Sequence, residues 1–391
     1  MPRKKLILGG PLFDGVHLFS QGTLLIEDRR IVHVFADTIH MINCEVIDVQ
    51  GRLIMPGLVD LHSDSLERSV EKRKGVFFDI GFAILNLDRQ AAACGITTFC
   101  HAVSFADNEL GLRSPDEAET CVRTIKAFND SAQALVKHKV HIRYEVGSEL
   151  SFQIVTRLVE ESLVDLVSIM DHTPGQGQFN SMASYIRYLT TEYQVPEHEI
   201  IEKSKEKQAK NARAWDMVSA LAKSVSMAGI PMLSHDDDTL EKIDLICTLG
   251  IEACEFPLTL PAAQKAFDQG LKIFMGAPNL LRNQSTSGSL KASEVLSRQL
   301  CTGLLSDYYP ESLLQAAFLG QTYTGCTEAA LKQVTAGPGD YLASPDRPGR
   351  LVPGADADII IVDHSHTWAH ITHTLLQGRT VFNTQIHEAV A

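Results

Sequence analysis

Short apolar runs alternate with longer segments of helical periodicity through the central part of the chain. The apolar runs predict eight strands, at 57–62, 96–101, 140–146, 166–172, 230–235, 252–256, 272–277 and 304–308. Helical segments are expected between many of them, at 117–136, 209–228, 260–269 and 289–300. A series of strand–helix units of this length is typical of an α/β fold with a closed parallel (β/α)8 TIM-like barrel. A doubly wound parallel sheet is the alternative.

Both ends of the chain show a different pattern, in which short alternating runs are separated by turn residues. Such runs occur at 6–8, 22–28, 30–34 and 45–48, and again at 357–363 and 370–382. Neither end has enough strands to bury a core by itself, so the two ends are expected to pair. We therefore predict a small β-sandwich domain from 1–54 and 345–391, with the barrel at 55–344.

Composition and charge narrow the classes of function. The 391 residues are 45% hydrophobic and 21% charged, as in ordinary globular proteins. A net charge of -13 argues against a nucleic-acid surface, although bound metal ions would still allow an anionic substrate. The eight cysteines include no C-x-x-C pair, and the first apolar run is broken at Gly9-Gly10-Pro11. We expect reduced thiols, no membrane segment and a cytoplasmic protein.

The strand predicted after the Pro56-Gly57 turn ends in His62 and Asp64. Residues i and i+2 of a strand point to the same side, so these two side chains can aim at one point. Nitrogen and oxygen donors together suit a divalent cation such as zinc, manganese or iron. A solvated strand end with no ligand is the alternative interpretation.

Other predicted strands also end in residues that can bind metals. These residues are Glu145, His172, His235 and Asp307. The carboxyl ends of barrel strands form the face that carries active sites. Because this set supplies more ligands than one tetrahedral ion uses, we expect one or two divalent ions, most simply zinc.

Several other residues that could bind a metal have a structural role as the alternative. Asp236, Asp237 and Asp238 can cap a helix that follows at Thr239, and this role is favoured for Asp238. His101 is expected to be a core or rim histidine, and Glu255 is either a supporting carboxylate or more remote from the metal. The four histidines of the C-terminal strands are expected to be structural or at the surface; they are His364, His366, His370 and His373.

At this point the sequence resembles a known family. Residues 56–62 resemble the first-strand signature of the amidohydrolase superfamily, and 353–361 resemble its return to the accessory sandwich. Segments 62–67, 170–176, 234–239, 275–279 and 306–310 resemble the ribose 1-methylphosphonate 5-triphosphate diphosphatases of the bacterial carbon–phosphorus lyase pathway for phosphonate degradation. The resemblance runs through nearly the whole chain.

This resemblance implies a cofactor, a reaction and roles for individual residues. The resemblance implies that the metal is bound by His62, Asp64, Glu145, His172 and His235. It places Asp307 beside the metal and its water. The reaction it implies is hydrolysis of a ribose 5-triphosphate to the 5-phosphate and pyrophosphate. A hydroxide on the metal attacks phosphorus, and Asp307 takes the proton. Most members of the superfamily have a His-x-His pair at the end of the first strand. Asp64 departs from that pattern but matches the diphosphatase branch, that is, the diphosphatases of the carbon–phosphorus lyase pathway.

One loop departs from the branch. Where the branch carries Arg-Gly-Gly-Ser-His-Ser-Gly, this chain has Arg282-Asn283-Gln284-Ser285-Thr286-Ser287-Gly288. Paired glycines let backbone amides approach an anion closely, and here they are replaced. Hydrolysis of a C–N bond at the same metal site, in a cyclic amide, N-acyl amine or heterocyclic amine, therefore remains an alternative function. A binding protein without activity is the third alternative.

Several residues and one insertion are expected to contact the substrate. Arg282 is the candidate phosphate clamp because a guanidinium matches phosphate bidentately, and weaker candidates are Arg68, Arg73 and Lys74. Asn279, Ser285 and Ser287 complete the expected substrate-binding set. The polar insertion at 176–210 is either a lid or a solvated helical excursion. The expected partners are a small phosphorylated substrate and further copies of the chain in a homo-oligomer.

Overall fold

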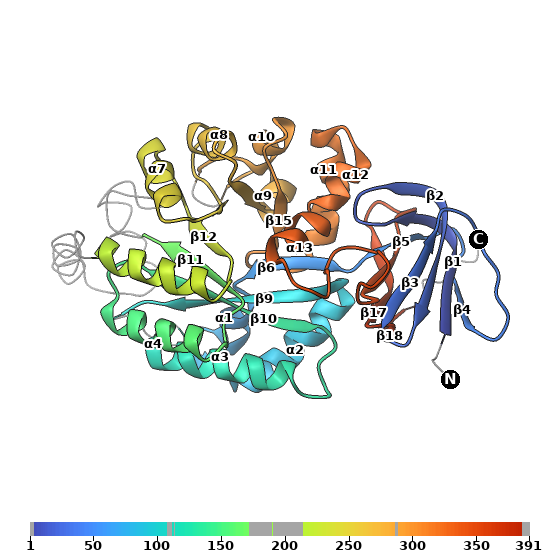
Figure 1. The fold of residues 1–391 in the computed structure, drawn as a ribbon, viewed down its shortest axis with the longest axis horizontal. Helices are drawn as coiled ribbons and strands as arrows, with labels where there is room; N and C mark the ends of the chain where they lie inside the picture. The colour runs from blue at the N-terminus through green and yellow to red at the C-terminus, as the bar shows by residue number, and fades with distance from the viewer. Residues whose placement is uncertain are drawn as a thin grey trace.

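The computed structural model describes residues 4–107, 112, 114–171, 190, 214–285 and 288–384. Two predicted site residues, His172 and Ser287, lie outside the described residues, and so does the 176–210 insertion except for residue 190. Two parts lie side by side: a barrel surrounded by helices, and a sheet in which N-terminal (blue) and C-terminal (red) strands meet (Figure 1). The predicted fold class is confirmed.

The barrel is one sheet of eight parallel strands in the order β15-β14-β13-β12-β11-β10-β9-β6. The strands are β6 (Leu58–Ser63), β9 (Ile96–Phe105), β10 (Lys137–Glu145), β11 (Leu166–Met170), β12 (Met232–His235), β13 (Ala253–Glu255), β14 (Lys272–Gly276) and β15 (Gly303–Leu305). All eight predicted strands are confirmed. The two edges meet just after β15, where Ser63 pairs with Asp307 in parallel.

Helices cover the outside of the barrel with one apolar face each. They are α1 (Ser65–Val70), α2 (Ile80–Ala93), α3 (Pro115–Asn129), α4 (Glu149–Glu160), the helix at 214–227, α7 (Leu240–Thr248), α8 (Leu260–Asp268), α9 (Ala277–Arg282), α10 (Ala292–Ser297), α11 (Ser312–Thr324) and α12 (Thr327–Lys332). In α3 the buried residues include Ala118, Cys121, Val122 and Ile125, the spacing of one helix face. A short hairpin of β7 (Glu71–Arg73) and β8 (Val76–Phe77) follows α1.

Two local predictions were wrong. Helix α3 ends at Asn129 instead of Val136, because the Asp88 carboxylate accepts the amides of Leu135 and Val136 at 2.9 and 3.0 Å. These bonds hold the chain out of a helix as it approaches β10. The cap of α7 is Thr239, whose Oγ1 accepts the Lys242 amide at 3.2 Å, and not Asp238.

Helix α13 (Ala336–Leu342) lies at the amino-terminal end of the barrel. The Tyr341 hydroxyl donates to the carbonyl of Met232, the first residue of β12, at 2.7 Å. Tyr341 also packs edge-on against Phe274, with ring centroids 5.4 Å apart. The inner core of the barrel includes Leu342 from the same helix. The strand ends that carry His62 and His235 are therefore at the other end of the barrel.

The second sheet has the order β18-β17-β16-β5-β1-β2-β3, and β4 also pairs with β1. Its strands are β1 (Lys4–Phe13), β2 (Leu18–Glu27), β3 (Arg30–Phe35), β4 (Glu45–Asp48), β5 (Leu53–Pro56), β16 (Ile359–Asp363), β17 (His370–Leu376) and β18 (Arg379–Asn383). β16 pairs antiparallel with β5, which joins the two ends of the chain. The predicted boundaries at residues 54 and 345 stay a prediction.

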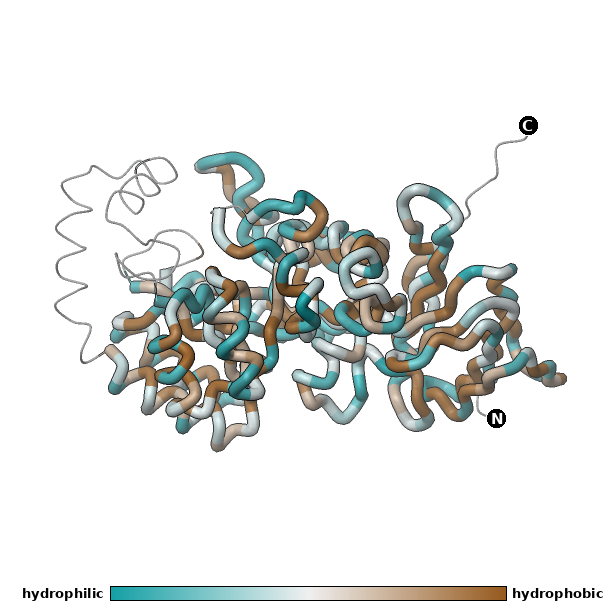
Figure 2. The backbone as a smooth tube through the Cα atoms, turned by 90° about the horizontal axis from the view of Figure 1, so that it is seen from above, coloured by the Kyte–Doolittle hydropathy of each residue, from teal (hydrophilic) through white to brown (hydrophobic). Residues whose placement is uncertain are grey.

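The largest apolar core is shared by the two parts, and the terminal sheet has a second core of its own. Hydrophobic stretches, in brown, occur along the chain in both parts (Figure 2). One core fills the space between barrel and helices and continues onto the terminal sheet at Met55 and Ile360, and a second lies in the terminal sheet around Leu24, Ile54 and Ile361. All eight cysteines are free thiols, as expected. Within the described ranges, no helix is long and apolar enough to cross a membrane.

Lys137 connects the two parts electrostatically. Its Nζ lies 2.7 Å from a carboxylate oxygen of Asp356 and 2.7 Å from one of Asp358, and it also pairs with Asp346. Lys137 is the first residue of β10, whereas the three aspartates precede β16. One ammonium group therefore holds three carboxylates at the junction between barrel and terminal sheet.

Candidate active site

Three of the predicted ligands come together at the carboxyl end of the barrel. His62 is the buried penultimate residue of β6, and its Nε2 lies 3.3 Å from Oδ1 of Asp64. One donor atom from each of His62, Asp64 and Asp307 lies within 4.8 Å of the others. An imidazole and two carboxylates at this separation suit a divalent cation.

Glu255 supports His62 from the opposite side of the ring. The Nδ1–H of His62 donates to Oε2 of Glu255 at 2.9 Å, and both side chains are buried. This bond fixes the ring so that Nε2 faces Asp64. A carboxylate behind a metal-binding histidine is the usual arrangement that orients the ligand nitrogen. Of the two alternatives for Glu255, the structure supports that of a supporting carboxylate.

His141 belongs to the same group of side chains, and the sequence analysis missed it. Its Nδ1 lies 2.8 Å from the Leu61 carbonyl and its Nε2 lies 2.8 Å from Oγ of Ser168. A carbonyl only accepts, so the proton is on Nδ1 and Nε2 accepts from Ser168. Burial lowers the pKa of His141 to about 3, which keeps the ring neutral. Its Nε2 is also 3.8 Å from Oε1 of Glu255.

Arg143 is the second residue that the sequence analysis did not assign to the site. Its buried guanidinium lies 2.7 Å from Oδ1 of Asp64 through Nη1, and its Nε contacts the sulfur of Met170 at 3.1 Å. His141, Arg143 and Glu145 follow one another at intervals of two along β10, so they share the face toward the barrel interior. That spacing from Glu145 is the signal that would have found both residues.

His235 is the last residue of β12 and Glu145 is the last residue of β10, with β11 between the two strands. The His235 ring centroid lies 5.6 Å from that of His62, and both rings pack edge-on against Phe256. His235 Nδ1 is 3.2 Å from Oδ2 of Asp236. Glu145 is buried at the end of β10, in register with Met170 of β11. Metal ligation by Glu145 and His235 stays a prediction, as it does for His172.

The shifted pKa values of His62, Asp307 and Glu255 reflect the negative charge gathered at the site. Burial alone would lower the pKa of His62, but the charge of Glu255 and the bond to Asp64 raise it to about 10. Burial and the neighbouring Asp64 carboxylate raise the pKa of Asp307 to about 6. Glu255, although buried, has its pKa held well below the usual range by the positive charge of His62. An added cation would relieve the repulsion between Asp64 and Asp307, so the residues fit a metal ion.

The predicted substrate-binding residues lie beyond the metal-binding group. The Asn279 amide braces its own loop, since Nδ2 donates to the Leu290 carbonyl at 3.1 Å and Oδ1 accepts the Ala292 amide at 2.9 Å. Ser285 is buried. Arg282 is exposed and donates through Nη1 to the Tyr308 hydroxyl at 3.3 Å. Substrate binding by Asn279, Arg282 and Ser285 stays a prediction.

The remaining histidines have the roles expected of them. His101 is fully buried and its Nε2 lies 2.7 Å from Nδ1 of His138, which contacts Asp88 at 3.0 Å. His364, His366 and His370 are exposed, and His373 is half-buried in β17.

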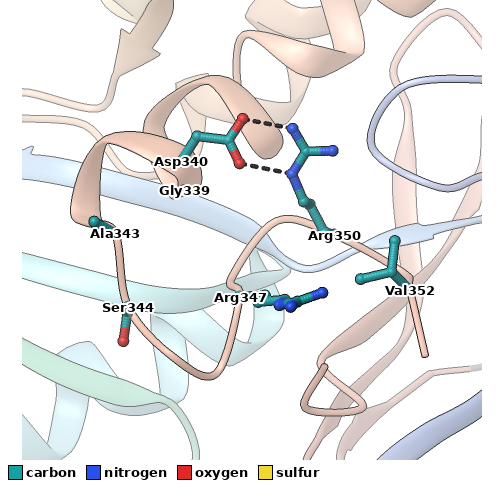
Figure 3. A pocket seen from close by; sticks show the side chains of 7 residues that line it. All are labelled: Gly339, Asp340, Ala343, Ser344, Arg347, Arg350 and Val352. Atoms are coloured by element: carbon teal, nitrogen blue, oxygen red, sulfur yellow. Dashed lines mark hydrogen bonds and ion pairs between the residues drawn. The ribbon is translucent and has the colours of Figure 1, made fainter. Parts of the chain in front are cut away.

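A cavity of about 470 Å³ lies at the other end of the barrel, between α13 and the segment that leads to β16. Arg350 forms two bonds to the Asp340 carboxylate at its wall, and Arg347 lies close by (Figure 3). This cavity includes none of the predicted ligands, and it is separated from His62 by the length of the barrel.

Comparison with known proteins places this geometry in a family. The chain is 33% identical over 346 residues to the alpha-D-ribose 1-methylphosphonate 5-triphosphate diphosphatase of Escherichia coli K12, covering 86% of this chain and 90% of that protein. A shorter segment of 92 residues, 22% of this chain and 19% of the relative, is 37% identical to the dihydroorotase of Bacillus cytotoxicus. No model of a protein family matches.

Solved structures agree at the level of the fold. The crystal structure of an amidohydrolase superposes with a TM-score of 0.62 at 18% identity, over 97% of this chain and 99% of the other. The expectation of a metal-dependent hydrolase is confirmed by these relationships. The chain belongs to the same family as the Escherichia coli diphosphatase, and it shares its fold with solved amidohydrolases.

Proposed function

We propose that the protein hydrolyses alpha-D-ribose 1-methylphosphonate 5-triphosphate to the 5-phosphate and pyrophosphate. The observation that carries this proposal is the 33% identity over 86% of the chain to the diphosphatase that bears this substrate in its name. The grouping of His62, Asp64 and Asp307 supports it, because phosphoryl transfer needs cations where charge develops.

We assign metal binding to His62, Asp64 and Asp307, with Glu145, His172 and His235 as further ligands of one or two ions. A bound divalent metal, zinc being the simplest choice, supplies Lewis acidity and makes its water more acidic. Glu255 holds the His62 ring in the orientation that presents Nε2, and His141 in turn lies beside Glu255 as a neutral donor and acceptor.

Asp307 is the proposed proton acceptor. A donor atom of its carboxylate lies within 4.8 Å of donor atoms of His62 and Asp64, which would place it beside a metal-bound water. Its backbone forms hydrogen bonds with the backbones of His62 and Asp64, which keeps the three residues together before substrate binds. Arg143 adds a permanent positive charge beside Asp64.

A second candidate is hydrolysis of a C–N bond at the same site. The observation that favours it is the segment shared with a dihydroorotase, together with the loss of the paired glycines at Asn283 and Gln284. The chemistry at the metal barely differs between the two, so the loops around the site decide between them.

Turnover by the metal-loaded protein tests the proposal. A ribose 5-triphosphate should be cleaved to pyrophosphate, whereas dihydroorotate and hydantoins should remain intact. Reaction in ¹⁸O-labelled water should place the label in the sugar 5-phosphate, because attack at the phosphorus next to ribose leaves pyrophosphate unlabelled. Asp307→Asn should lower kcat by about 10²- to 10⁴-fold.

Turnover of amides alone would replace the first proposal with the second.

The homo-oligomer stays a prediction, which light scattering on the purified protein would test.

A further inference from the structure

We propose that Arg68, Tyr308 and Arg282 form a clamp that binds the polyphosphate end of the substrate, beside the metal-binding group. This inference rests on the proposed function and adds to it where the non-reacting phosphates are held. Nothing in the metal-binding geometry requires these three residues.

The two arginines converge on one phenol ring. The Arg68 guanidinium carbon lies 5.1 Å from the centroid of the Tyr308 ring, a cation–π distance. Arg282 Nη1 donates to the Tyr308 hydroxyl at 3.3 Å. Tyr308 therefore has one guanidinium over its face and another at its oxygen, and its O–H remains free to turn toward an acceptor.

The three residues come from adjacent units of the barrel. Arg68 is in α1 after β6, Arg282 ends α9 after β14, and Tyr308 follows β15. β14 and β15 are neighbours in the sheet, and β15 and β6 meet at the closure. Tyr308 directly follows Asp307, and consecutive Cα atoms are about 3.8 Å apart. The clamp is thus built next to the metal-binding group, at the carboxyl end of the barrel.

The charges of the clamp are not balanced by protein carboxylates. Both guanidinium groups are exposed, and in the part of the chain that the structure describes neither forms an ion pair with Asp or Glu. Arg123, Arg157 and Arg350 are also at least partly exposed, yet each pairs with a carboxylate. Two like charges on one ring repel each other, and an anion between them removes that cost.

The shape of the cluster favours a polyphosphate over a single phosphate. Guanidinium groups recognise phosphate oxygens bidentately, and these two approach different sides of the same ring. In the proposed reaction the pyrophosphate leaves from the same end of the substrate, so the clamp would also stabilise its charge as the bond breaks.

Calorimetric titration of metal-stripped protein with inorganic tripolyphosphate tests the clamp without turnover. Arg68→Gln and Arg282→Gln should each weaken tripolyphosphate binding by about 10- to 100-fold, the effect of one charge-assisted hydrogen-bond donor. Tyr308→Phe keeps the ring under Arg68 and loses the hydroxyl, so a smaller loss is expected. Arg298→Gln, an exposed arginine at the end of α10, is the matched control and should bind as the unmodified protein does.

Two further measurements separate this inference from the proposed function. In the metal-loaded enzyme the Arg68 and Arg282 variants should raise KM for a ribose 5-triphosphate more than they lower kcat, and should leave inhibition by orthophosphate unchanged. Unaltered tripolyphosphate affinity in both arginine variants, or no binding by the unmodified protein, would overturn the clamp. Tight tripolyphosphate binding without triphosphate turnover would keep the clamp and reject the proposed function.

Discussion

The backbone amide of Asp307 donates a hydrogen bond to the carbonyl of His62 at 3.0 Å. The Asp64 amide returns a bond to the Asp307 carbonyl at 2.6 Å. These two bonds join the first and last strands of the barrel at the residues whose side chains form the proposed metal site. Metal binding and closure of the barrel therefore involve the same few residues.

Removing the metal should loosen this closure. A ligand that binds only the folded state stabilises it in proportion to its affinity and concentration, so a chelator should lower the Tm. Hydrogen exchange followed by mass spectrometry should become faster in peptides that contain Asp64 and Asp307. Peptides from β1 and β2 in the terminal sheet are the internal control and should exchange as before; uniform acceleration would show that the effect is not local.

Glu255→Gln should weaken metal binding while leaving the fold intact. An amide at this position still fills the space but no longer carries the charge that orients His62, and loss of such a partner typically costs about 10- to 100-fold in metal affinity. Competition with a chromophoric chelator measures the affinity. Glu252→Gln, an exposed carboxylate in the same segment, is the control and should bind metal normally. Equal affinity in the two variants would contradict the supporting role of Glu255.

The metal-free protein should lose stability as pH rises from about 7 to 10. The pKa of His62 is raised from 6.5 to about 10 in the folded state, so its proton stabilises the fold fully below 6.5 and ceases to do so as pH passes 10. Metal binding to the His62 nitrogen should release this proton, and the affinity for zinc should therefore increase with pH over the same range.

Urea unfolding at several pH values and calorimetry in buffers of different ionisation enthalpy measure the two effects. In His62→Asn both the alkaline loss of stability and this proton release should disappear.

Lys137→Met should destabilise the protein strongly. Without the ammonium group, the carboxylates of Asp346, Asp356 and Asp358 face one another at the junction of barrel and terminal sheet. Breaking a buried ion pair by removing one partner costs about 3–5 kcal/mol in the free energy of unfolding. Urea unfolding gives this value, and Lys332→Met at an exposed position is the control. Adding Asp356→Asn to Lys137→Met should restore part of the loss, because one of the repelling charges is removed.

The strands of the barrel could be predicted because they are buried on both faces and appear as apolar runs in the sequence. The ligands at their ends followed from the same pattern. His141 and Arg143 were missed because they lie inside β10 and not at its end, although their spacing of two from Glu145 places them on the same face of the strand. Likewise, the end of α3 depends on Asp88, a residue more than 40 positions earlier that only the fold brings near.

Contacts between residues far apart in the chain also could not be predicted from the sequence. Glu255 was identified as a carboxylate near the site, but its bond to His62 joins positions 193 residues apart. Arg282 and Arg68 were both candidate phosphate ligands, whereas their common contact with Tyr308 depends on how the barrel closes.

The pairing of β5 with β16 has a consequence for how the protein is made. A ribosome delivers β1 to β5 first, and roughly 300 residues follow before the partner strand emerges. During that interval β5 has an open edge that can pair with another chain. The nascent N-terminal strands therefore depend on shielding, by a chaperone or by rapid folding of the barrel, until synthesis is nearly complete.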